Sequence, residues 1–314
     1  MPRRIKQRIH QRKSRRAPRR THGAEPVDGP LLEMLAGRWK EFLAQLRHCR
    51  AEFTEPSVHD LRVAIRRLVA AVDLLAMLSP PEQFISARVH LKGLLKRMSP
   101  LRDTQVQMLA VKKLSQEYPG LAVFSTVLLL REQRNLGRVS RRLVIFPIRN
   151  MQQSLFSAAR GLERSMRNPS VKMAVRLSLQ GSLASAFLRV VELSRRVDAS
   201  DPTTIHRLRV AFKKFRYATE ILRPDLEKAH HKALNDYQTR MGDLHDMEAL
   251  MESIEGLRVR TSSRPQPGVP GRSIPTGDLA GIQRKLRRQH SLLVRQFISS
   301  LDGLYRFYPP GTGS

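Results

Sequence analysis

Apolar residues recur at intervals of three and four positions from Leu31 to Leu304, in one segment after another. This spacing is typical of amphipathic α-helices, and the strict alternation expected of half-buried strands is not evident. Prolines punctuate the pattern mostly where a helix can begin, because proline suits the first helical turn. They are Pro56, Pro80, Pro81, Pro100, Pro119, Pro147, Pro169, Pro202 and Pro224. The pattern predicts an all-α fold of about nine or ten helices.

Two segments fall outside this pattern. Residues 1–28 combine dense positive charge with few apolar residues, which predicts a disordered basic arm. Residues 260–281 are rich in Pro, Gly and Ser and lack periodicity, which predicts a flexible loop before the last helix. The folded part is therefore expected to span residues 29–310.

Two short motifs occur twice in the same order. The sequence VHDLRVAIRR at 58–67 matches IHRLRVAFKK at 205–214, and MSPLRDTQVQ at 98–107 corresponds to MGDLHDMEAL at 241–250. A repeated order of motifs indicates an internal duplication. We expect repeat one at about 31–166 and repeat two at about 170–306, each forming a bundle of about four helices.

The first motif separates basic and apolar residues on opposite sides of a helix. With His59 set at zero, Arg62, Arg66 and Arg67 lie at about −60°, −20° and +80°, since each residue advances about 100°. Apolar side chains fill the opposite side. The second copy repeats the stripe with His206, Arg209, Lys213 and Lys214, and adds Arg216 and Tyr217. We expect no acidic residue three or four positions away to neutralise these cations.

The net charge is +30, and ten of the basic residues lie within residues 1–22, so about +20 belongs to the folded part. Such an excess favours a polyanionic partner. A histidine in the first helical turn lies beside unpaired backbone N–H groups, which favour phosphate. Arginine adds planar bidentate donors and lysine adds a mobile charge. The stripes therefore predict phosphate binding, although a solvated basic face remains the simpler reading of any single helix.

Several classes of protein are disfavoured. The single Cys49 excludes an intramolecular disulfide and a cysteine zinc site, which fits the cytoplasm. The run LAVFSTVLLL at 121–130 is too short to span a bilayer, so no membrane partner is expected. The chain has no G-x-x-x-x-G-K-[ST] phosphate loop. The pairs His59-Asp60 and His245-Asp246 superficially resemble metal phosphohydrolase motifs, but neighbouring helix residues diverge and no further ligands accompany them. We expect no enzyme activity, metal or cofactor.

At these residues the chain resembles the CHAD family, the conserved-histidine α-helical domains. The resemblance covers about residues 31–306 and rests on both stripes and on the LRD and LHD turns that follow them. It implies two pseudo-symmetric four-helix bundles around a shared basic cleft or pore. It also implies non-catalytic binding of inorganic polyphosphate and association with polyphosphate granules. The sequence departs from the family pattern at Val69, because a basic residue often stands at this position in the family and the second copy has Arg216 there.

Further basic residues are secondary candidates for the same cleft, although each set is as readily explained as solvated surface. They are Lys92, Lys96, Arg131, Arg134, Arg138, Arg284, Arg287 and Arg288. The duplicated aspartates Asp103 and Asp246 are expected to be caps or salt-bridge partners.

Nucleic acid is the alternative partner, because a basic arm on a basic body is the electrostatic footprint of DNA- and RNA-binding proteins. The stripes lack interleaved aromatic residues for base stacking, with Tyr217 the lone candidate. DNA or RNA would then bind through the arm and through the basic helical faces.

Overall fold

The structure is a computed structural model that describes residues 29–79, 82–263 and 276–308. Within these ranges the regular structure is entirely helical, which confirms the predicted all-α fold. The predicted basic arm, residues 1–28, lies outside the described residues. The α-helices are α1 (Pro30–Ala51), α2 (Glu55–Leu78), α3 (Glu82–Leu114), α4 (Ala122–Val144), α5 (Ile148–Ser165), α6 (Pro169–Ser194), α7 (Pro202–Leu222), α8 (Lys228–Ser263) and α9 (Thr276–Ile298). Two 3₁₀ segments, η1 (Pro119–Leu121) and η2 (Leu301–Phe307), complete the order.

The predicted prolines lie at the starts of α2, α6 and α7, where the structure adds capping side chains. Each begins with a proline in its first turn and with a side chain that accepts a backbone N–H bond. The Asp201 carboxylate, for example, accepts from the N–H of Thr203 at 2.9 Å and so caps α7.

Pro100 is an exception, because it lies inside α3 and the prediction of a helix start there is wrong. Its missing N–H leaves a gap in the backbone hydrogen bonds of α3. The Pro100 carbonyl accepts hydrogen bonds from the Thr104 hydroxyl at 2.7 Å and the Asn135 amide at 3.1 Å, which tie this part of α3 to α4.

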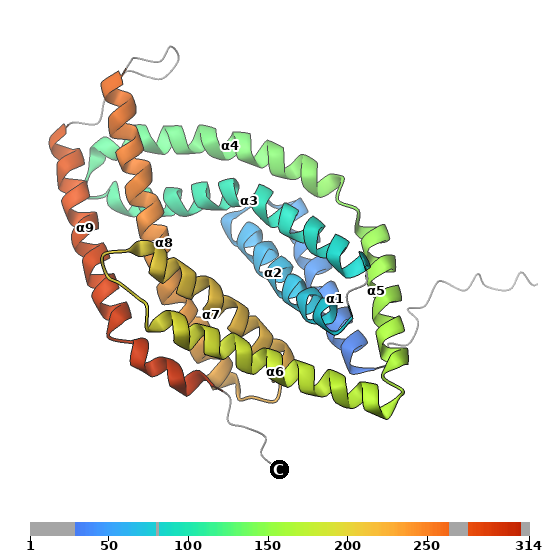
Figure 1. The fold of residues 1–314 in the computed structure, drawn as a ribbon. Coiled ribbons are helices and arrows are strands. Elements are labelled where there is room, and N and C mark those ends of the chain that lie inside the picture. The colour runs from blue at the N-terminus through green and yellow to red at the C-terminus, as the bar shows by residue number, and fades with distance from the viewer. Residues whose placement is uncertain (1–28, 80–81, 264–275, 309–314) are drawn as a thin grey trace, which may run out of the picture.

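Most consecutive helices pack against each other in both halves of the chain, while α5 packs on α1 and α3 (Figure 1). In the first half α2 lies between α1 and α3, and α4 packs on α3; in the second, α7 lies between α6 and α8, and α9 packs on α8. The two halves meet where α2 packs on α7 and α3 packs on α8. The same order of helix contacts in both halves is what an internal duplication predicts. The duplication itself stays a prediction.

Three apolar clusters hold these helices together. The buried residues of the first lie within α1–α5, with Leu179 of α6 packed against them, and those of the second lie within α6–α9 and η2. The third joins the halves, because Val111 and Phe124 pack with Ile254 of α8 and Ile282 of α9. The apolar face predicted for α2 lies in the first cluster, and Leu61, Ile65 and Leu68 are fully buried there.

The predicted loop is shorter than expected at both ends. α8 continues to Ser263 and α9 begins at Thr276, so only residues 264–275 of the predicted 260–281 lie outside the described residues. Leu279 and Ile282 are buried in the third cluster, and their burial explains why helix extends into a segment rich in Pro and Gly.

Candidate anion-binding site

The two basic stripes come together where α2 and α7 meet. The charges that act most strongly on the Lys213 ammonium of α7 are Arg209, Arg66, Arg62 and Arg216, and all four are cations. Arg62 and Arg66 belong to α2, so residues from both halves share one electrostatic environment. We call Arg62, Arg66, Arg209 and Lys213 the cation cluster.

Arg62 is held by α3. Its side chain is only 7% exposed, and its Nη1 donates to the Leu95 carbonyl at 3.0 Å and the Ser99 hydroxyl at 3.1 Å. Ser99 immediately precedes Pro100, where the α3 backbone pattern is interrupted, and Leu95 lies about one turn earlier. Burial and the nearby Arg66 charge lower the Arg62 pKa to about 10, an effect that Asp103 partly opposes.

The other members of the cluster have few partners. Among the described residues, Arg66 makes no hydrogen bond or ion pair, and the buried Nε of Arg209 has no acceptor. Burial lowers the pKa of Arg209, and burial together with four cationic neighbours lowers the pKa of Lys213 to about 7. The fold thus forces positive groups together, and a bound anion would relieve the resulting repulsion.

Carboxylates from α3 and α8 lie beside this cluster. Asp103 acts on Arg62, while Asp246 acts on Arg209, Arg102 and His59. Burial and the proximity of Asp246 raise the pKa of Asp103, against the lowering effect of Arg62. Neither aspartate forms an ion pair within 4 Å among the described residues, so they moderate the positive potential without pairing its cations.

The two stripe histidines are both exposed at the edge of the cluster. Partial desolvation is the main cause that lowers the pKa of His59, with the Arg66 and Arg62 charges contributing. Desolvation and the nearby His245 lower the pKa of His206, whose ring centroid lies 5.6 Å from that of His245. In the free protein, these shifts favour the neutral imidazoles.

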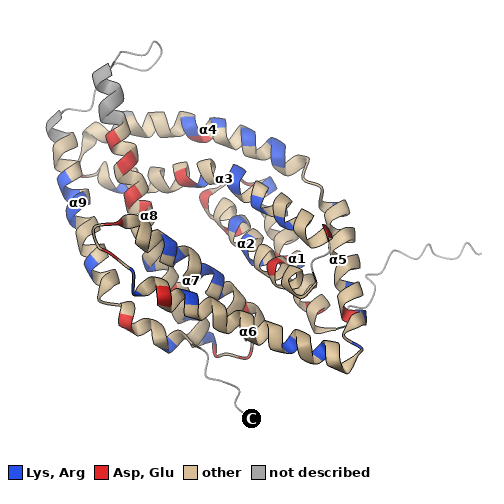
Figure 2. Ribbon diagram, in the orientation of Figure 1, with Lys and Arg blue, Asp and Glu red and all other residues tan. Residues whose placement is uncertain are grey.

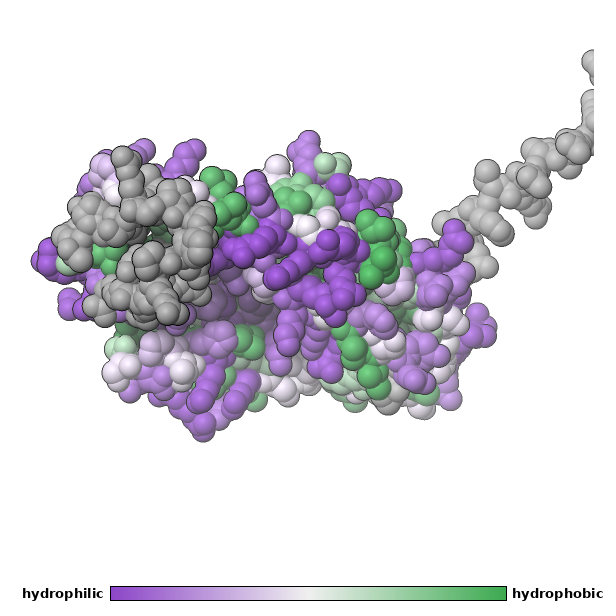
Figure 3. Space-filling view, turned by 90° about the horizontal axis from the view of Figure 1, so that it is seen from above, coloured by the Kyte–Doolittle hydropathy of each residue, from purple (hydrophilic) through white to green (hydrophobic). Residues whose placement is uncertain are grey.

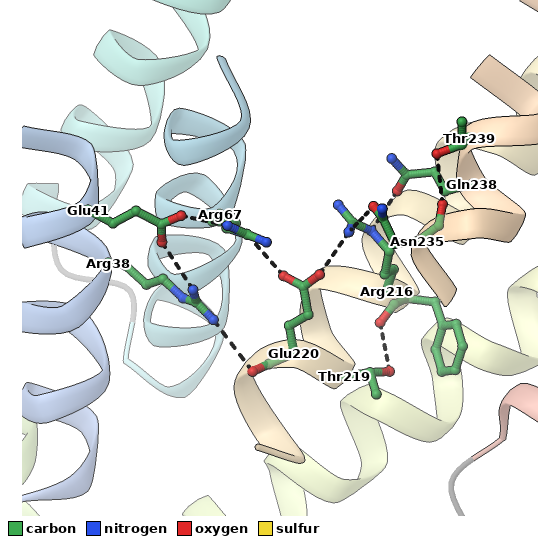
Figure 4. Close-up of polar contacts among 10 residues, drawn as sticks. Arg38, Glu41, Arg67, Arg216, Thr219, Glu220, Asn235, Gln238 and Thr239 are labelled. Carbon is green, nitrogen blue, oxygen red and sulfur yellow. Dashed lines mark hydrogen bonds and ion pairs between the residues drawn. The ribbon is translucent and has the colours of Figure 1, made fainter. Parts of the chain in front are cut away.

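Arg67 and Arg216 are not free cations (Figure 4). The Glu220 carboxylate accepts from Arg67 Nε at 3.1 Å and from Arg216 Nη1 at 2.8 Å, and Glu41 also accepts from Arg67. The expectation that no acidic residue three or four positions away neutralises the stripe is therefore wrong for Arg216, whereas the partners of Arg67 come from other helices. Glu220 follows Arg216 by four residues, a spacing that was visible in the sequence.

Tyr217 and Lys214 have contrasting environments. Tyr217 is 4% exposed, with the Arg216 guanidinium 4.4 Å from its ring centre, so its ring packs in the protein and is not presented as a stacking surface.

Lys214 is exposed and lies close enough to Lys92 of α3 to lower the Lys92 pKa, although desolvation is the larger cause. Lys92 also pairs with Asp73 at 3.7 Å. Of the secondary residues, Lys92 is thus placed near the second stripe.

The remaining secondary candidates lie mainly on other surfaces. Figure 2 shows basic residues along α4 and α9 as well as on α2 and α7. Arg134, Arg138, Arg284, Arg287 and Arg288 are exposed, as is Lys96 on α3, and Arg131 lies within 3.5 Å of the Gln107 side-chain oxygen. The face seen from above, which carries α4, is largely hydrophilic with scattered apolar patches (Figure 3). The charges that act most on the cluster come from α2, α3, α7 and α8 instead.

Neither a metal centre nor a membrane span is found in the part of the chain that the structure describes. No three His, Cys, Asp or Glu side chains gather there in a way that would hold a metal ion. No described helix combines the length and the apolar character needed to cross a bilayer.

The fold and site define an all-helical protein in which cations from two halves meet at a helix–helix junction. The chain belongs to the CHAD family, because the family model for the CHAD domain matches residues 33–255. No curated protein matches its sequence significantly.

Two solved structures share the fold. The crystal structure of the CHAD domain from the plant Ricinus communis has a TM-score of 0.64 and 16% identity, covering 90% of this chain and 95% of that chain. PptA from Streptomyces chartreusis has a TM-score of 0.58 and 14% identity, covering 89% of this chain and 100% of that chain.

The lowered pKa of Lys213 predicts a pH-dependent cost in stability. Between about pH 7 and the ordinary lysine pKa of 10.5, the unfolded chain binds more protons at this residue than the folded chain does. The free energy of unfolding should therefore rise with pH through this window. The full cost of burying the charged Lys213 should be present below about pH 7. We expect Lys213→Met to stabilise the protein at pH 6.5 by about 1–2 kcal/mol after allowance for solvent screening, and by less at pH 9.

Urea denaturation of wild type and Lys213→Met at the two pH values measures this difference. Lys214→Met is the matched control, because it removes an exposed lysine from the same helix. An equal gain in stability at pH 6.5 and pH 9 would show that the Lys213 charge is not under strain.

Proposed function

We propose that this chain binds inorganic polyphosphate at the junction of α2 and α7. The observation that carries the proposal is the environment of Lys213, a partly buried ammonium whose strongest electrostatic neighbours are four cations from both halves. A group of this kind is stabilised by an anion that contacts both helices at once. The histidine-containing stripes on which the CHAD resemblance rests support the same ligand.

The mechanism is counterion release combined with geometric fit. Arg62 and Arg66 from α2 and Arg209 and Lys213 from α7 supply donors to successive phosphates, while Lys214 and Lys92 extend the positive surface. A polyphosphate chain displaces the small anions gathered there, so the entropy of their release favours binding. His59 and His206, near the N-terminal ends of their helices, become better donors once the phosphates favour their charged forms.

The proposed role is binding without chemistry. Asp103 and Asp246 lie among arginines in positions that moderate charge, and we assign no acid–base step to them. Polyphosphate is favoured over nucleic acid because Tyr217, the aromatic residue of the stripe, is buried under Arg216 and offers no surface for base stacking.

Competition binding tests the proposal. Labelled long-chain polyphosphate is bound to the full chain at several salt concentrations and displaced with unlabelled polyphosphate, single- or double-stranded DNA, or RNA. We expect polyphosphate to compete at lower phosphate concentration than any nucleic acid. The proposal is wrong if nucleic acids compete equally well or better per phosphate.

A further inference from the structure

One carboxylate connects the two halves beside the cation cluster (Figure 4). The Glu220 side chain of α7 is 12% exposed, and its two oxygens are 3.1 Å from Arg67 Nε of α2 and 2.8 Å from Arg216 Nη1 of α7. Arg67 belongs to the first half, whereas Arg216 belongs to the second. The carboxylate is therefore a bridge between halves as well as a partner within its own helix.

Both arginines are anchored on their own sides of this bridge. Arg67 Nη1 donates to Glu41 of α1 at 2.5 Å, and Glu41 also accepts from Arg38 at 3.2 Å. The Arg216 guanidinium donates to Asn235 at 3.0 Å and Gln238 at 2.8 Å, both on α8. The network thus links α1 and α2 with α7 and α8 through Glu220.

The Glu220 bridge lies beside the cation cluster, where the basic faces of α2 and α7 repel each other. Arg67 follows Arg66 directly, and Arg216 is one helical turn from Lys213, so the bridge borders the cation cluster. The buried apolar residues of the two halves form separate clusters, with Leu179 of α6 packed against the first, and the cluster that joins the halves lies in α3, η1, α4, α8 and α9. An anion between α2 and α7 therefore counteracts the mutual repulsion of their basic faces.

We propose that Glu220 is a positioning residue, which holds α2 and α7 at the separation and register at which their cations act on one polyphosphate chain. This inference rests on the proposed function. The competing view is that Glu220 is only a nearby negative charge. The two views predict opposite signs, since removing a negative charge beside an anion site strengthens binding unless that charge also organises the site.

Glu41 supplies the matched control, because its carboxylate contacts the same arginine but lies on the first half alone. Glu41→Gln and Glu220→Gln each remove one negative charge beside Arg67. We expect Glu41→Gln to bind long-chain polyphosphate as tightly as wild type or more tightly. Glu220→Gln should bind about tenfold more weakly despite its more positive charge, in line with coupling energies typical of ion-pair networks.

Glu220→Asp separates geometry from charge. It keeps the carboxylate but shortens its reach, so it should also weaken binding with the net charge unchanged. Hydrogen–deuterium exchange on the free proteins should show faster exchange in α2 and α7 for both Glu220 variants than for wild type or Glu41→Gln. This readout also covers a Glu220→Gln variant that is too unstable for titration.

The outcomes separate the inference from the function on which it rests. Wild type that fails to bind polyphosphate contradicts the proposed function, while the exchange comparison still tests the bridge. If wild type binds and Glu220→Gln binds more tightly, as Glu41→Gln does, Glu220 acts only through its charge. Wild-type affinity together with wild-type exchange in Glu220→Asp would likewise overturn the positioning role.

Discussion

At physiological salt, polyphosphate binding is expected to fall below detection when Arg62, Arg66, Arg209 and Lys213 are all replaced by glutamine. Each replacement removes a charge from the one region where both halves act on the same ligand. If each lost phosphate contact weakens binding by about 1 kcal/mol, the combined loss is on the order of a thousandfold. Isothermal titration with long-chain polyphosphate measures the effect, and circular dichroism checks that the helical content is retained.

The control for this variant removes the same charge from other surfaces. Arg134, Arg138, Arg287 and Arg288 are exposed on α4 and α9 and are not among the charges that act most strongly on the cluster. Replacing these four by glutamine should reduce affinity by less than about tenfold through the general field of the protein. Equal losses in the two variants would mean that net charge, rather than the junction of α2 and α7, determines binding.

Salt should weaken polyphosphate binding steeply. The cation cluster together with Lys92 and Lys214 offers about six contacts, and by analogy with DNA six contacts cost about three decades of affinity between 50 and 200 mM salt. Titrations at five salt concentrations give the slope of log affinity against log salt. The variant that replaces the whole cation cluster by glutamine can be measured at low salt. Its slope of log affinity against log salt should be shallower than that of wild type by about 3–4.

A salt slope near zero would contradict this account, because it would require contacts that release few counterions. An equally steep slope in wild type and in the variant that lacks the cation cluster would show that polyphosphate binds at another site. Residues 1–22 carry ten basic side chains, so the same titration on a chain lacking these residues tests whether the slope belongs to the helical part.

Local features of the fold were predictable because a single helix determines them. Periodicity alone places Leu61, Ile65 and Leu68 on the buried side of α2 and the basic stripe on the other side. The capping residue and proline at the start of α7 likewise depend on a few adjacent positions. The interrupted α3 was missed, because tertiary contacts around the Pro100 carbonyl support a helix that proline disfavours.

The pairing of stripe residues was less predictable, because it depends on how the two halves meet. The sequence places Arg66 and Arg67 side by side, yet among the described residues Arg66 has no acidic partner, whereas Arg67 pairs with Glu41 and Glu220. Glu220 follows Arg67 by 153 residues, so helical spacing gives no sign of their contact. The i,i+4 pair of Arg216 and Glu220 and the i,i+3 pair of Arg38 and Glu41 were the local signals of this network among the described residues.

The central claim is that cations of α2 and cations of α7 bind one polyphosphate chain together. The most direct measurement is a double-variant cycle by isothermal titration at low salt, where the combined variant can still be measured. It compares Arg62→Gln/Arg66→Gln on α2, Arg209→Gln/Lys213→Gln on α7, and the combined variant. We predict that each pair of replacements weakens binding of long-chain polyphosphate by at least tenfold, with no change in the number of chains bound per protein. Wild-type affinity in either double variant, or two independent binding events in wild type, would contradict a shared site.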